Sequence, residues 1–211
     1  MSTSRSVTAA ALAAAIVASQ PGGAGAQYAA YVFMPQIYVG MGLGADFIGN
    51  NSDLNACASG ANCQEITGLA GGGFALFAGL RLSEWVGLEL TYDAFFHEGS
   101  AGNQYNLATR QSLRGDAKVF FLSGGGLEPY LQAGVGAHFL GDEYAVAAVG
   151  GGFQLGGGVD LYLIPSLSLG ANVLYRAAYF QGFEAADSRE TRDGFVHDIY
   201  VMLNATLHYA Y

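Results

Sequence analysis

The feature that most constrains this chain is a two-residue alternation of apolar and polar side chains, which returns in segment after segment. Such a period places successive side chains on opposite faces of a β-strand, whereas a helix needs apolar residues three or four positions apart. The segment 85–96 is one example. One face carries Val86, Leu88, Leu90 and Tyr92, and the other carries Gly87, Glu89, Thr91 and Asp93. The alternation predicts an all-β protein whose strands each have one apolar face.

Eight segments of this kind follow one another along the chain. They cover 36–47, 72–83, 85–96, 111–122, 129–140, 150–163, 167–180 and 196–211. Tight joints follow the second, fourth and sixth segments, and longer, more polar joints follow the first, third, fifth and seventh. Bacterial outer-membrane barrels have an even number of strands, short periplasmic turns and longer extracellular loops. The same order here would leave both ends of the barrel in the periplasm.

The placement of the charges separates a membrane barrel from a soluble β-sandwich or a lipocalin-like barrel, which also alternate. In this chain the charged residues share the face that is rich in Gly and therefore tightly enclosed, so the apolar face must meet lipid. The composition agrees, because 52% of the residues are hydrophobic and 12% are charged. No apolar run reaches the ~18–20 residues of a transmembrane helix. We therefore predict an eight-stranded antiparallel up-and-down transmembrane β-barrel.

Aromatic residues with outward parity gather at both ends of the expected strands. Those at the loop ends are Phe47, Phe96, Phe139 and Tyr179, and those at the turn ends are Trp85, Tyr209 and Tyr211. Two aromatic girdles are typical of the two membrane–water interfaces of a barrel. We expect these seven side chains to lie there.

The N-terminus has the pattern of a secretory signal peptide. Arg5 precedes a short apolar core at 7–19, and Ala24-Gly25-Ala26 forms a small-residue cleavage site before Gln27. The alternative is an anchor helix, but the apolar core is short for a span. We expect a signal peptide at 1–26, a short periplasmic segment at 27–35 and the barrel at 36–211, which places the protein in the bacterial outer membrane.

Several segments resemble strands of a known family. They are Gly73-Phe74-Ala75-Leu76-Phe77-Ala78-Gly79-Leu80-Arg81, Gly87-Leu88-Glu89-Leu90-Thr91-Tyr92, Pro129-Tyr130-Leu131-Gln132-Ala133-Gly134-Val135-Gly136, Gly156–Asp160 and Leu167–Ala171. The chain resembles the OmpA-type eight-stranded outer-membrane barrels, in their stand-alone surface-antigen or porin-like branch, over roughly 36–211. The resemblance implies the fold and no particular activity. Because the last expected strand reaches residue 211, we expect no peptidoglycan-binding domain of the kind found in full-length OmpA architecture.

The charged residues with inward parity are the main candidate site. They are Asp46, Arg81, Glu89, Asp93, Arg114, Asp116, Lys118, Asp160 and Arg176. A narrow eight-stranded barrel is filled by side chains, and isolated charges there would be costly, so we expect them to pair. One interpretation is a structural network that plugs the lumen. The other is a gated narrow pore, in which a pair between Glu89 and a basic residue exchanges.

The two cysteines of the chain, Cys57 and Cys63, both fall in the first long joint. An exported protein meets an oxidising compartment, so we expect a disulfide between them. A metal site is the alternative, but two thiols alone make a weak ligand set. We expect no metal and no cofactor.

Three histidines, His97, His138 and His197, map near the outer rim, where we expect ordinary interface residues. No Ser-His-acid motif is recognisable, so an enzyme, such as a lipid-modifying one, is less favoured than a structural or surface protein. A narrow porin-like channel for small or hydrophobic solutes is the second hypothesis. The net charge of −9 argues against nucleic acid as a partner. The expected partners are outer-membrane lipid, lipopolysaccharide and, during insertion, the barrel-assembly machinery, with the protein a monomer.

Overall fold

The computed structural model describes residues 35–49, 64–66, 70–101, 104–122, 126–142, 146–181 and 194–210. Its strands are β1 (Gln36–Ile48), β2 (Gln64–Ile66), β3 (Ala70–Arg81), β4 (Val86–Ala101), β5 (Gln104–Phe120), β6 (Leu127–Asp142), β7 (Val146–Ile164), β8 (Leu167–Gln181) and β9 (Gly194–Ala210). No helix within the described ranges is long and apolar enough to cross a membrane.

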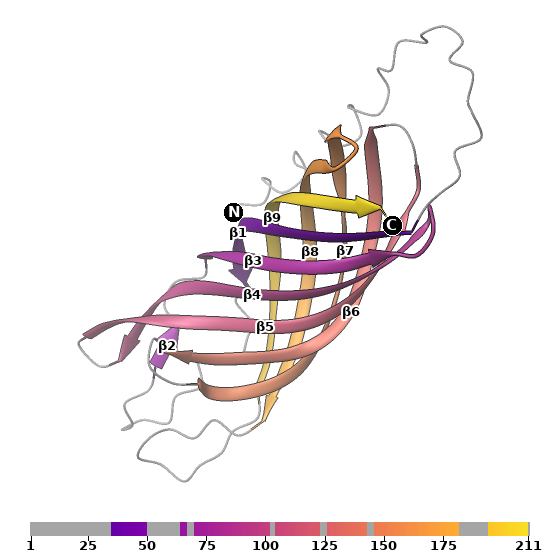
Figure 1. Ribbon diagram of the computed structural model, residues 1–211. Coiled ribbons are helices and arrows are strands. Elements are labelled where there is room, and N and C mark those ends of the chain that lie inside the picture. Colours follow the sequence, from indigo (N-terminus) through magenta and orange to yellow (C-terminus); the bar gives the residue numbers. More distant parts are fainter. Residues whose placement is uncertain are drawn as a thin grey trace, which may run out of the picture. The chain divides into compact units, whose positions relative to one another are not determined.

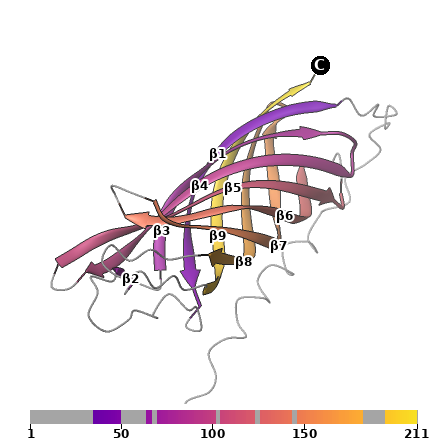
Figure 2. The ribbon, with the colours of Figure 1, turned by 90° about the horizontal axis from the view of Figure 1, so that it is seen from below.

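Eight of these strands form a closed antiparallel barrel. From β3 to β9 each strand pairs with the next along the chain, and β1 pairs with both β3 and β9. The closing pair runs from Gln36↔Ala210 to Ile48↔Asp198. The two views in Figures 1 and 2 show the long strands curling around a common axis. The predicted eight-stranded up-and-down barrel is confirmed.

The short strand β2 was not expected from the sequence. It pairs with the outer part of β4, from Gln64↔Ala101 to Ile66↔Gly99, beyond Phe96, the last residue of β4 that pairs with β3. It therefore extends one edge of the wall at the loop end and does not belong to the ring of eight.

The two faces of the wall differ as the alternation predicts. Outward side chains are large, apolar and exposed, with Leu43 exposed by 73% and Leu203 by 68%. Inward side chains on the same strands are buried, including Asp46 at 0% and Asn204 at 7%. Each strand of the ring pairs with a neighbour on both sides, with register shifts at Leu140/Gly141 and Tyr162/Ile164. A closed wall of this kind can face lipid because its backbone groups pair between strands.

The prediction of long joints after the third and fifth segments is wrong. β4 and β5 continue to pair as far as Ala101↔Gln104, which leaves residues 102–103 between them. Likewise β6 ends at Asp142 and β7 begins at Val146. The apolar alternation fades in these stretches, but the backbone N–H and C=O groups still pair across the hairpin. Side-chain pattern therefore reports the apolar part of a strand and misses its polar extension.

Some predictions fall outside the described residues. These are the signal peptide at 1–26, positions 27–34 of the segment before the barrel, Cys57, Cys63 and Tyr211.

Candidate functional site

All nine charged residues predicted to face the lumen lie there, and each is at most 8% exposed. They come from β1, β3, β4, β5, β7 and β8. Three arginines and three aspartates gather in the half of the barrel where β1 and β8 end and β9 begins, which we call the loop end. We call this group of six residues the loop-side layer. Its members are Asp46, Asp93, Asp198, Arg110, Arg114 and Arg176.

Arg176 is at the centre of the loop-side layer. Its Nε donates to Asp198 Oδ1 at 2.7 Å, and its Nη2 donates to Asp46 Oδ2 at 2.9 Å. Its Nη1 donates to Asp93 Oδ1 at 3.2 Å. These three aspartates come from β9, β1 and β4, so one guanidinium of β8 connects four strands. Planar guanidinium donors suit this task because they are fixed in a fork.

The other two arginines link the same aspartates. Arg114 Nη2 lies 2.7 Å from Asp93 Oδ2. Arg110 forms an ion pair with Asp198, and its Nη1 lies 3.6 Å from Asp46 Oδ2. The layer thus balances three positive charges with three negative charges, which offsets the cost of burying them.

Two buried apolar clusters adjoin the loop-side layer. Towards the loops are Ile48, Leu140, Ala178, Phe180 and Val196. The second cluster begins level with the layer, where Ala75 is across the ladder from Asp93 and Phe95 from Arg110, and it continues towards the turns. Its members are Tyr38, Ala75, Phe77, Phe95, Leu174, Tyr200 and Met202. The guanidinium carbon of Arg176 lies 4.7 Å from the centroid of the Tyr200 ring, so the second cluster is in direct contact with the charges. Asp46, Asp93, Arg110 and Arg176 accordingly have no exposed surface.

The half nearer the turns holds two separate ion pairs, which we call the turn-side pairs. Lys118 Nζ lies 2.5 Å from Glu89 Oε2, and Arg81 Nη1 lies 2.5 Å from Glu128 Oε2. Arg81 also donates to the Tyr162 hydroxyl at 3.2 Å and to the Glu84 carbonyl oxygen at 2.9 Å.

Asp116 and Asp160 form no ion pair among the described residues. Gln154 connects Asp116 to the loop-side layer, because its amide donates to Asp116 Oδ1 while its carbonyl oxygen accepts from Arg114. Gly134 makes room for Asp116, since a Cβ there would collide with the Asp116 carboxylate. Asp160 lies directly across the ladder from Glu128, the residue that pairs with Arg81.

Sequence reasoning missed three members of these groups and one histidine that contacts a member. Arg110 lies one residue before the segment predicted as a strand, and Glu128 was assigned to a turn. Asp198 has inward parity and pairs with Arg176 across the ladder, a signal available from the register. The fourth, His97, has its Nε2 2.7 Å from Asp46 Oδ1.

The expectation that His97 and His138 are interface residues is wrong. Both are 1% exposed and face the lumen. His97 does so because β4 continues past residue 96, where the predicted strand ended, whereas His138 lies within the predicted segment 129–140 and has inward parity there. His197 has outward parity as expected, and its ring lies 6.1 Å from that of Tyr175.

The aromatic residues predicted for the girdles have outward parity wherever the structure describes them. Phe47, Phe96, Tyr179, Trp85 and Tyr209 are exposed by 39–57%. Phe139 is half-buried on the same face.

One Ser–His contact lies at the turn end. Ser168 Oγ and His208 Nε2 are 2.9 Å apart, but Ser168 has no exposed surface. Within the described ranges no group of three or more His, Cys, Asp or Glu side chains is placed to hold a metal ion.

Solved structures with the same architecture identify the fold. Neisserial surface protein A matches with a TM-score of 0.60 and 14% identity, over 81% of this chain and 96% of that one. The chain has the fold of the eight-stranded outer-membrane β-barrels. The outer-membrane protein OprG from Pseudomonas aeruginosa matches this barrel with a TM-score of 0.52 and 14% identity, over 84% of this chain and 97% of that one. No protein-family model and no curated protein sequence matches the chain.

Proposed function

We propose that the protein is exported to the bacterial outer membrane and serves there as a structural or cell-surface barrel whose lumen is closed by its own side chains. The loop-side layer carries the proposal. A pore that conducts ions needs a continuous wetted path, and four charged side chains of this layer have no exposed surface. The ion pairs that join them span the lumen, from β8 to β1 and β4.

The location rests on the outer face of the wall and on the architecture. Exposed Leu, Val and Phe side chains cover the outside of all eight strands of the ring, a surface that only an apolar medium accommodates. Structures of the same fold are described as a surface protein and an outer-membrane protein. Cleavage before Gln27, periplasmic ends, and contacts with lipid, lipopolysaccharide and the assembly machinery belong to the same proposal.

Absence of enzymatic activity is also part of the proposal. The Ser168–His208 contact is the arrangement most like a catalytic one in the lumen, and a substrate cannot reach a serine that has no exposed surface. Phospholipid and lipid A profiles that stay unchanged on overexpression would support this. A changed profile that Ser168→Ala restores would overturn it.

The deciding experiment is ion conductance in planar bilayers, after a gel of boiled and unboiled outer-membrane fraction has shown a heat-modifiable band. The native protein should give no steady current. The double variant Arg110→Ala, Arg176→Ala should give one, because it removes two of the three guanidinium groups from the closed layer. The matched variant Lys118→Ala, Glu89→Ala should stay silent, since the loop-side layer is intact. A steady current through the native protein would instead favour a narrow channel for small solutes.

A further inference from the structure

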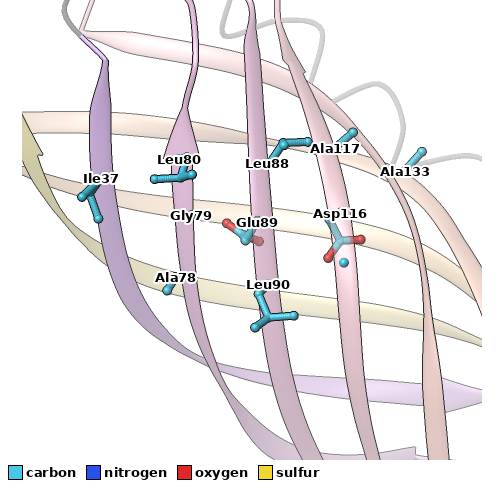
Figure 3. Close-up of a pocket in the computed structure, with 11 residues that line it drawn as sticks. Ile37, Ala78, Gly79, Leu80, Leu88, Glu89, Leu90, Asp116, Ala117 and Ala133 are labelled. Carbon is cyan, nitrogen blue, oxygen red and sulfur yellow. The ribbon is translucent and has the colours of Figure 1, made fainter.

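A shallow apolar depression lies on the outer face of the barrel, nearer the turns than the loops. It has a volume of about 630 Å³ and is lined by residues of β1, β3, β4, β5 and β6 (Figure 3). Its turn-end position follows from Leu80 and Leu88, which are close to the ends of β3 and β4 where the two strands join.

The floor of the depression consists of small outward residues on β5 and β6. Gly115, Ala117 and Ala133 lie there, and Ala117 is directly opposite Ala133 across the ladder. Leu88 and Leu90 of β4 stand beside the floor, opposite Ala117 and Gly115, and both are exposed by about half. The floor is therefore low because its residues have a methyl group or no side chain, whereas their neighbours on β4 are leucines.

Along β5 the floor ends at two bulky outward residues. Leu113 and Val119 are each exposed by nearly half and flank Gly115 and Ala117 on the same strand. They are six positions apart, which is about 20 Å at ~3.3 Å per residue. Sideways the depression extends across five strands, from Ile37 of β1 to Ala133 of β6. We call this depression the groove.

The chemistry of the lining excludes a polar occupant. Its charged members, Glu89 and Asp116, are 6% and 4% exposed, and their side chains belong to the lumen. What remains at the surface is Ala, Gly, Leu and Ile. No hydrogen-bonding side chain of the groove is available to a headgroup or a sugar.

Size argues against a second copy of the chain. Eleven residues line the depression, whereas a stable protein–protein interface takes about 20–30 residues a side. A groove of this shape cannot remain empty in a membrane either, because its walls would lose their dispersion contacts. The medium that surrounds a membrane barrel supplies an occupant of the required length and chemistry.

We propose that this groove binds one acyl chain of a phospholipid from the periplasmic leaflet and holds it longer than the rest of the wall holds its lipid. The inference rests on the proposed outer-membrane location, in which the turn end faces the periplasm. The small floor on β5 and β6 admits the chain, and Leu88 and Leu90 pack against it.

Gly115→Leu tests the proposal and has a matched control. A Cβ added to Gly115 meets no atom within 4 Å, and the same holds for Gly151, an outward glycine on β7 outside the groove. Both variants therefore add the same side chain to open outward space. Ala133→Leu fills the groove independently, should Gly115→Leu fail to insert.

The native protein and the variants are placed in phosphatidylethanolamine–phosphatidylglycerol vesicles doped with a phospholipid that carries a diazirine in its acyl chain. After photolysis, labelled peptides are mapped by mass spectrometry. The native protein should be labelled preferentially at Leu88–Leu90. Because Leu at position 115 displaces about two methylenes, that labelling should fall about tenfold in Gly115→Leu and stay unchanged in Gly151→Leu.

The remaining outcomes each overturn the proposal. Equal labelling in all variants would mean ordinary lipid contact. Loss of a dimer band in Gly115→Leu, with no selective labelling in the native protein, would identify a second copy as the occupant. Heat-modifiability on a gel monitors insertion into the vesicles. A native protein that does not insert would contradict the proposed membrane location, and the lipid site depends on that location.

Discussion

The two halves of the lumen neutralise their charges in different ways. In the loop-side layer, three arginines share three aspartates, and Arg176 alone contacts all three. The turn-side pairs are separate, with Lys118 bound to Glu89 and Arg81 bound to Glu128. A shared network fails together when one member is lost, whereas a separate pair fails alone. The loop-side layer should therefore dominate both the stability of the barrel and the closure of its lumen.

The largest effect is expected from Arg176→Met. Met removes the charge but keeps much of the side-chain length, and it leaves three buried aspartates short of a partner. Breaking a buried ion pair in this way costs about 3–5 kcal/mol. Urea unfolding of the protein in vesicles, followed by the fluorescence of Trp85, the one tryptophan of the chain, measures the loss. A loss below about 1 kcal/mol, the range of an exposed ion pair, would show that the network does not act as a unit.

A smaller effect is expected from Lys118→Met. It leaves one buried carboxylate, Glu89, without its ion pair, whereas Arg176→Met affects three. Glu89 keeps a hydrogen bond from the Thr91 hydroxyl, so we expect a loss of about 3 kcal/mol, at the lower end of the range for breaking a buried pair. The same unfolding experiment measures it. The double variant Lys118→Met, Glu89→Gln should recover part of the loss, because replacing a whole buried pair is often close to neutral. If Lys118→Met destabilised as much as Arg176→Met, the contrast between the two halves would be wrong.

The smallest effect is expected from Ser168→Ala, which removes a neutral hydrogen bond to His208 at the turn end. Such bonds contribute about 0.5–1.5 kcal/mol. A shift in the urea midpoint with an unchanged slope would report it. A loss of unfolding free energy greater than about 1.5 kcal/mol would indicate that Ser168 also stabilises the packing around it at the turn end.

Some lumen residues could be predicted from the sequence and others could not. Period-two parity places Glu89 and Lys118 in the lumen and Leu90 outside, because the side-chain direction of a strand follows position alone. The lumen position of Glu128 and Arg110 was not predicted, because both lie outside the predicted strands. Glu128 was in a predicted turn, and Arg110 was just before a predicted strand. The turn-side pair of Arg81 and Glu128 could not be predicted for that reason.

The sequence by itself determined the class of fold, the number of strands in the ring, and the face of the wall on which each side chain of the alternating stretches lies. These follow from local patterns, since alternation, tight turns and enclosed glycines act within a strand or between neighbours. Only the tertiary structure decided that Arg176 meets Asp46 and Asp93 across the lumen, and that small residues on β5 and β6 leave a groove beside Leu88 and Leu90. Such contacts depend on how the closed sheet staggers its strands, and that stagger is a property of the whole barrel.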